Sequence, residues 1–223
     1  MNNIDEILKD LDKRLSKIEN LFSNDNSYNL NVLGNRKAKS INSTVRIKDV
    51  KLLFPTISPV DIDKSTVDPS TLVVIPNDEE VIEEIQKAYM HAFEMGKNTD
   101  KFPADFSYDD LTANKKESVF LNKNDFINSQ KHKVREFLPE FIGNGILMRN
   151  VKVGEDEEKN FGVVLRDKSG NLLSPNERIV TGDIGEIVIN FHPYNFNNKL
   201  GISRYIQGFI RTSSSNNAKS LFI

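Results

Sequence analysis

The sequence predicts a mainly β domain that carries one packed α-helix and follows a separate N-terminal helix. Two observations support this fold class. Short runs rich in β-branched residues recur between residues 44 and 212, and apolar residues repeat with helical spacing in 4–22 and again in 81–93. The chain has 223 residues, which is enough for one large β domain with appendages.

The N-terminal segment, residues 1–24, carries a heptad pattern. Its apolar residues alternate at spacings of four and three, namely Ile4, Leu8, Leu11, Leu15, Ile18 and Phe22. This stripe either docks on the chain's own domain or joins copies into a homo-oligomer through residues 4–22, and both interpretations stay open. Residues 25–43 are rich in Asn and Ser without a period, and we expect a linker there.

The first half of the main domain begins with a strand. The run TVRIKDVKLLFPTI starts at Thr44 and is β-branched and roughly alternating until Pro55 ends it. A short buried strand is expected over 71–76. The packed helix follows, with Asn77 as its N-cap and Gly96 as its end. Residues 97–145 mix aromatic residues with lysines and turn formers, so we expect long loops there.

The second half returns to strands. They are expected over 145–153 and 161–167, and residues 182–196 form either a strand pair or one long strand with two different faces. Phe191 shares a face with Ile187 and Ile189 and is expected in the core. Residues 197–201 turn the chain, and 202–212 return antiparallel. The main domain therefore spans 44–212, and residues 213–223 form a flexible tail.

The composition narrows the possible functions. No window approaches about 18 uninterrupted apolar residues, and the first residues lack a signal-peptide pattern, so we expect no membrane span and a cytoplasmic protein. The absence of cysteine excludes disulfides and thiolate zinc sites. No P-loop, HExxH or similar motif occurs, and the three histidines stand apart. These features argue against an enzyme, a metal site and a cofactor.

Basic residues gather in two regions, although the formal net charge is -2. Residues 36–51 hold six Lys or Arg against one Asp, and no acidic residue follows Asn190. Binding of single strands needs basic residues for phosphates and aromatic faces for bases. For each candidate, an ordinary packed or solvated strand position is the alternative. The candidate DNA-binding residues are Arg46, Lys48, Lys51, Phe54, Arg149, Lys152, Tyr194, Lys199, Arg204, Tyr205 and Arg211.

Three stretches occur in a characteristic order: RIKDVKLLFPTI, TLVVIPNDEEVIEEIQKAYMHAF, and the block from Phe161 to Ile210. Most specific is the spacing within the third block of Gly162–Val164, Gly182–Asp183, Asn190–Phe191, Tyr194, Lys199–Gly201 and Gln207. Together the stretches resemble the small OB-fold single-stranded DNA-binding proteins of tailed phages of the podophage type. The resemblance implies an OB-fold barrel over 44–212. It also implies sequence-independent binding of single-stranded DNA in phage or mobile-element replication and recombination, in the host cytoplasm if the chain is phage-encoded.

The chain departs from this family in its tail. Members commonly end in an acidic segment, whereas this chain ends SSSNNAKSLFI. Leu221, Phe222 and Ile223 remain as an apolar tip that offers a docking segment for a replication partner. Two other functions stay open at this point. One is a structural or virion oligomerisation protein with a β-rich head, and the other is an OB-type RNA-binding or inhibitory domain.

Overall fold

The computed structural model describes residues 35–58, 69–113, 117–154, 163–174 and 176–215. The chain divides into two units, Met1–Arg36 and Lys37–Ile223, and almost all described residues belong to the second. The predicted heptad helix, with its proposed oligomer contacts at 4–22, lies outside the described residues. The apolar tip at 221–223 lies outside them as well.

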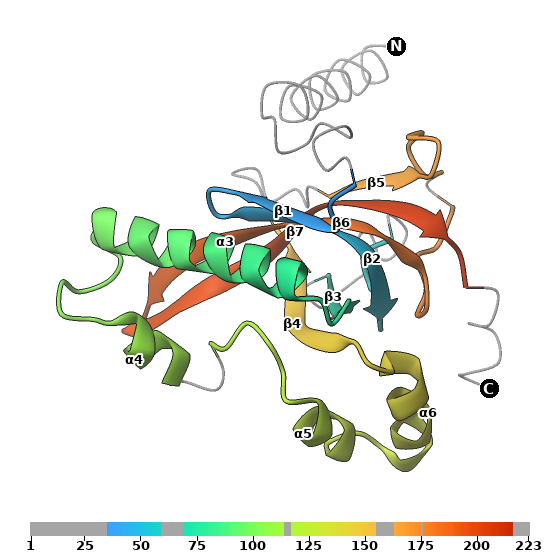
Figure 1. Cartoon of the computed structure of the whole chain (residues 1–223), viewed down its shortest axis with the longest axis horizontal. Coiled ribbons are helices and arrows are strands. Elements are labelled where there is room, and N and C mark those ends of the chain that lie inside the picture. Colours follow the sequence, from blue (N-terminus) through green and yellow to red (C-terminus); the bar gives the residue numbers. More distant parts are fainter. Residues whose placement is uncertain (1–34, 59–68, 114–116, 155–162, 175, 216–223) are drawn as a thin grey trace, which may run out of the picture. The chain divides into compact units, whose positions relative to one another are not determined.

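Seven strands form one sheet in the part of the chain that the structure describes (Figure 1). They are β1 (Ala38–Ile41), β2 (Thr44–Leu53), β3 (Ser70–Ile75), β4 (Ile146–Val153), β5 (Val164–Asp167), β6 (Ile184–Phe196) and β7 (Lys199–Ser213). β2 pairs antiparallel with β3 and β6, β3 with β4, and β6 with β7, while β4 runs parallel to β7. These five strands close a ring in the order β2–β3–β4–β7–β6, which is an OB-like β fold.

The prediction of a mainly β domain is confirmed, with two corrections. β6 is one strand of 13 residues, so the alternative of a strand pair over 182–196 is wrong. β1 lies within the stretch that the sequence predicted as a linker, and it pairs with β2 through a two-residue turn in which Asn42 has a φ of 51°. Asn tolerates this left-handed conformation well, so Asn42 suits the tight turn between β1 and β2.

Helix α3 (Glu79–Asn98) is the packed helix that the sequence predicted, with different ends. Its N-cap is Asp78, whose side chain accepts a hydrogen bond from the backbone N–H of Glu80, so the assignment of Asn77 as the cap is wrong. The helix also continues past Gly96 instead of ending there. A Cβ at Gly96 would overlap the ring of Phe102, so this glycine serves close packing and not termination.

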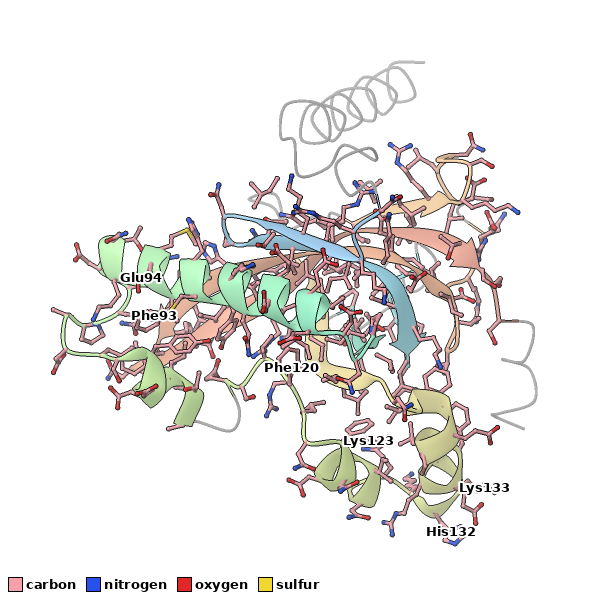
Figure 2. All side chains as sticks on the ribbon, viewed as in Figure 1. Phe93, Glu94, Phe120, Lys123, His132 and Lys133 are labelled. Carbon is pink, nitrogen blue, oxygen red and sulfur yellow. The ribbon has the colours of Figure 1, made fainter. Side chains whose placement is uncertain are left out.

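The prediction of long loops over 97–145 is wrong, because three helices lie there. They are α4 (Tyr108–Ala113), α5 (Lys123–Asn128) and α6 (His132–Ile142). Two of them have only six residues each, too few to show a helical period in the sequence. α5 and α6 lie together beyond the start of β4 (Figure 1), and Lys123 and His132 mark them in Figure 2.

The larger of two apolar clusters fills the ring and continues to the buried side of α3. Tyr89 and Phe93 of this helix belong to it together with Phe191 of β6. The rings of Tyr89 and Phe191 meet edge to face, with centroids 5.4 Å apart. Phe191 is fully buried, as its position beside Ile187 and Ile189 predicted. α3 therefore closes one side of the ring's core.

The smaller apolar cluster lies outside the ring, under α5 and α6. Leu53 of β2, Val74 of β3 and Leu147 of β4 meet Leu138 and Ile142 of α6 there. Successive residues of a strand point to opposite faces, so these strand residues face outward while their neighbours face the ring's core. We call this part of the outer surface, with Leu53, Val74 and Leu147, the covered face.

Candidate nucleic-acid interface

A row of residues crosses the outside of the ring where β4 ends. Its members are Ser70, Lys152, Tyr205, Asn190 and Thr44, each the Cα partner of the next. The adjacent row consists of Val153, Ile206, Ile189 and Val45, none of them more than 4% exposed. Because strand residues alternate between faces, the first row must point away from this core. We call it the cross-strand row.

Lys152 and Tyr205 occupy the centre of the cross-strand row. They are Cα partners in the parallel pair of β4 and β7, so their side chains emerge side by side. Lys152 is exposed and Tyr205 is half-buried. The ring of Tyr205 rests against the backbone of Gly154, where an added Cβ would lie 3.5 Å from a ring carbon. This packing holds the ring in place while part of it remains open to a ligand.

The hairpin of β6 and β7 extends the same outer face. Asn190, Tyr194 and Phe196 share a side of β6 by the period of two, and Phe196 is 68% exposed. Lys199 is the Cα partner of Phe196 across a two-residue turn. We call the outer surface of β4, β6 and β7 that carries Lys152, Tyr205, Tyr194, Phe196 and Lys199 the bare face. Phe196 was not among the candidate residues, although the alternation along 182–196 puts it on the side of β6 that carries Tyr194.

The segment Glu117–Leu121 fills a gap between β4 and β7, which pair directly at residues 152–153 and 205–206. Leu121 N–H donates to the Leu147 carbonyl at 2.8 Å, so the segment runs along β4. On the other side, Ile202 N–H of β7 donates to the Glu117 carboxylate at 3.3 Å. The segment thus completes the wall of the ring beside the bare face.

Tyr194 is tied to this segment. Its hydroxyl donates to Glu117 Oε1 at 3.1 Å. Burial, and then the charge of the Glu117 carboxylate, raise the pKa of Tyr194 above its ordinary value, and Tyr205 contributes to the pKa in the same direction. The strand register puts both tyrosines on the bare face, because Gly201, the Cα partner of Tyr194, and Tyr205 lie four residues apart on β7. Both side chains present ring faces suited to base stacking.

Arg149 and Arg204 each donate a hydrogen bond to the segment Glu117–Leu121. Arg149 Nε donates to the Ser118 carbonyl at 2.8 Å, and Arg204 Nη2 donates to the Glu117 carbonyl at 3.0 Å. Arg204 is only 9% exposed, and this burial lowers the pKa of its guanidinium. Arg204, one of the candidate DNA-binding residues, is therefore a buried residue whose guanidinium holds the wall of the ring.

Arg46 is also placed differently from the prediction. β2 does lie beside β6, as a basic strand next to the terminal hairpin requires. However, Arg46 is 4% exposed and its Nε donates to the carboxylate of Glu186 on β6. This ion pair compensates the charge within the sheet. Lys48, two residues further along β2, is half-buried.

Three further candidates lie away from the cross-strand row. Lys51 Nζ donates to the Phe141 carbonyl at 2.6 Å and lies 4.8 Å from the centre of its ring, which places Lys51 beside α6. Phe54 packs into the small cluster of the covered face. Arg211, near the end of β7, pairs with Glu177 and donates to the Arg178 carbonyl. The structure does not bring these three together with Lys152 and Tyr205.

His192 points to the outer side of β6 and is exposed. Lys101 Nζ lies 2.9 Å from its Nε2 and therefore donates to a neutral ring. Partial burial, and then the positive charge of Lys101, lower the pKa of His192 below its ordinary value of 6.5. The imidazole is therefore uncharged at neutral pH.

The described part of the chain holds neither a metal-binding cluster nor a membrane-spanning helix. No group of three or more His, Cys, Asp or Glu side chains is placed there to hold a metal ion. Likewise, no helix among those residues is long and apolar enough to cross a membrane.

No protein-family model and no curated protein matches the chain.

Among solved structures the chain is similar to the C-terminally truncated single-stranded DNA-binding protein from bacteriophage Enc34. The identity is 13%, 80% of this chain and 92% of that chain are covered, and the TM-score is 0.50. The Enc34 protein in complex with single-stranded DNA has 12% identity, coverages of 80% and 94%, and a TM-score of 0.48. Gp2.5, the single-stranded DNA-binding protein encoded by bacteriophage T7, has 14% identity, coverages of 78% and 87%, and a TM-score of 0.44. The chain therefore shares the fold of the Enc34 protein, in agreement with its OB-like ring.

Proposed function

We propose that this chain binds single-stranded DNA of any sequence, without cutting or copying it, through the bare face of an OB-fold barrel. The observation that carries the proposal is the pairing of exposed Lys152 with the half-buried ring of Tyr205 on adjacent strands. Such a pair offers a charge for phosphate and an aromatic face for a base. The biological setting is replication or recombination of phage or mobile-element DNA in the host cytoplasm.

The position of this pair on the barrel supports the proposal. OB folds bind oligonucleotides over the face of their second and third strands, which are β3 and β4 in this ring, and through the flanking loops. The cross-strand row begins on these two strands with Ser70 and Lys152. The similarity of fold to a protein named as single-stranded DNA-binding supports the same assignment.

The mechanism follows from the two residue types. Lys152 and Lys199 attract phosphates and release the counterions condensed on the strand, so affinity falls as salt rises. Bases then stack on Tyr205, Tyr194 and Phe196, and each stacked base contributes about 1–3 kcal/mol. Every base has a ring face, so this contact does not require a particular sequence.

A fluorescent poly-dT oligomer, titrated at low and high salt, tests the proposal. We expect tight binding at low salt, weaker binding at high salt, and preference over a duplex of the same length. Lys152→Ala should reduce the salt slope by about 0.7, the value for one phosphate contact on a single strand. Lys168→Ala is the matched control, because Lys168 is an exposed lysine beside β5. Equal affinity for duplex, or micromolar affinity at low salt, would overturn the proposal, and tighter binding of an rU oligomer would redirect it to RNA.

We also propose that residues 4–22 join copies of the chain and that Leu221, Phe222 and Ile223 contact a replication partner. The heptad spacing supports the first part, and the apolar tip at the end of a polar tail supports the second. Light scattering of the full chain and of a variant without residues 1–24 tests the first part. The same number of copies per particle in both proteins would contradict it.

A further inference from the structure

A carboxylate lies beside the stacking residues of the bare face. Glu117 is half-buried, its Oε1 accepts the Tyr194 hydroxyl, and its Oε2 accepts Ile202 N–H. Gly201 leaves the space that this arrangement needs, since a Cβ there would overlap both the carboxylate and the Tyr194 hydroxyl. The carboxylate is thus held at one position by β6 and β7.

The donors among the described residues leave part of the hydrogen-bond acceptor capacity of this carboxylate unused. Two carboxylate oxygens offer about four lone-pair sites, and an ionised carboxylate can only accept hydrogen bonds. The two donors from Tyr194 and Ile202 occupy one site on each oxygen. A ligand at this place is therefore favoured if it brings hydrogen-bond donors and disfavoured if it brings acceptors.

DNA bases differ in this respect. An unpaired cytosine presents its N4 amino group and an unpaired adenine its N6 amino group, whereas thymine has the O4 carbonyl at the corresponding position and its single donor, N3–H, lies between two carbonyl groups. A base that stacks on Tyr194 with its edge over the hydroxyl end of the ring would lie beside Glu117, the partner of that hydroxyl. An amino group there donates to the carboxylate, while a carbonyl oxygen meets a negative charge.

We infer that Glu117 makes the interface bind bases that carry an exocyclic amino group more tightly than thymine. This inference rests on the proposed function and names a specificity-determining residue within the same site. The charge of Glu117 also repels phosphates, so the phosphates are expected at Lys199 and Lys152, which lie on either side of Gly201 along the bare face.

The test compares dC and dT oligomers of equal length in the same salt. The full chain should bind dC about threefold to tenfold more tightly, the range of one net hydrogen bond. Glu117→Gln keeps the shape but adds an amide donor and removes the charge, so the ratio should approach one through tighter binding of dT. Glu177→Gln is the matched control: this carboxylate pairs with Arg211, away from the stacking tyrosines, and its loss should leave the ratio unchanged.

A second measurement needs no variant. An oligomer of N4,N4-dimethylcytosine lacks the amino hydrogens and should bind the unaltered chain no better than dT. Equal affinity for dC and dT, or a preference that survives either Glu117→Gln or the dimethylated base, would overturn the inference. Failure of every oligomer to bind at low salt would instead overturn the proposed function, so the two failures are distinguishable.

Discussion

The covered face and the bare face belong to the same closed ring, yet their outer surfaces differ in chemistry. On the covered face, Leu53, Val74 and Leu147 are buried under α5 and α6. On the bare face, the equivalent outward positions hold Lys152, half-buried Tyr205 and, at the hairpin tip, exposed Phe196. β4 contributes to both, with Leu147 near its start and Lys152 near its end.

This difference separates the residues that stabilise the fold from those that are proposed to bind DNA. An outward apolar residue on an OB-like barrel needs a covering layer, and the segment between α3 and β4 supplies one for half of the ring. The other half keeps residues that tolerate water and can bind a charged, aromatic ligand. Substitutions on the first face should therefore change unfolding, and those on the second should change binding.

Leu147→Ala should have the largest effect. Leu147 is fully buried between β4 and α6, so its truncation leaves a cavity and should lower the free energy of unfolding by about 2–5 kcal/mol. Urea denaturation followed by circular dichroism measures this. Leu172→Ala is the control, because Leu172 is 52% exposed and should change stability by less than about 0.5 kcal/mol. Equal losses of unfolding free energy in the two variants would show that burial under α6 does not make the covered face a source of stability.

Tyr205→Ala should weaken binding of single-stranded DNA by about 1–3 kcal/mol through the loss of one stacked base. Its effect on unfolding should be smaller than that of Leu147→Ala, since Tyr205 is only half-buried. Tyr205→Phe keeps the ring and should bind nearly as well as the unaltered chain. Fluorescence anisotropy measures all three proteins. If the alanine variant binds normally, the stacking surface lies at Tyr194 or Phe196 instead.

Lys51→Met tests a lysine that the sequence analysis named as a candidate DNA-binding residue. In the structure this side chain lies against α6. Loss of its hydrogen bond to the Phe141 carbonyl and of its contact with the Phe141 ring should lower the free energy of unfolding by about 1–2 kcal/mol. Affinity for DNA should not change. A loss of affinity comparable to that of Lys152→Ala would show that the interface extends over both faces.

The smallest effect concerns pH. The pKa of His192 lies below 6.5 in the folded protein, so the imidazole gains its proton only when the pH falls below that value. The stability that the neutral imidazole contributes is fully present above the pKa of His192 in the unfolded chain. It is lost as the pH falls through the lower pKa of His192 in the folded protein. The new charge beside Lys101 should at the same time raise affinity for DNA. Titrations at about pH 7.5 and about pH 5.5, with His192→Asn as the control, measure the difference.

The fold was largely predictable because the strands carry local patterns. The β-branched run from Thr44 and the alternation from Ile184 each identify a strand without knowledge of its partners. The helices α4 and α5 escaped prediction because six residues are too few for a period. Their aromatic neighbours take part in long-range packing that no local spacing records.

The site was only partly predictable. Lys152, Tyr194, Lys199 and Tyr205 lie on one face. The two tyrosines could be suggested from the sequence because each carries a hydroxyl and lies close to Lys or Arg along the chain. Arg46 and Arg204 were indistinguishable in the sequence from surface arginines, because their partners Glu186 and Glu117 are distant along the chain. Charge alone identifies a basic residue but not whether another part of the fold compensates it.

The turn between β6 and β7 has a consequence for the order in which the molecule folds. Asn197 and Asn198 adopt φ angles of 50° and 60°, the left-handed geometry that matches the twist of a two-residue hairpin. The long hairpin can zip up from this turn through neighbouring contacts, on the microsecond scale typical of such elements. The parallel pair of Lys152 with Tyr205 must instead close a long loop before it gains any contact energy. Nucleation at the two asparagines would thus precede closure of the barrel wall, and the bare face would be among the last parts of the domain to assemble.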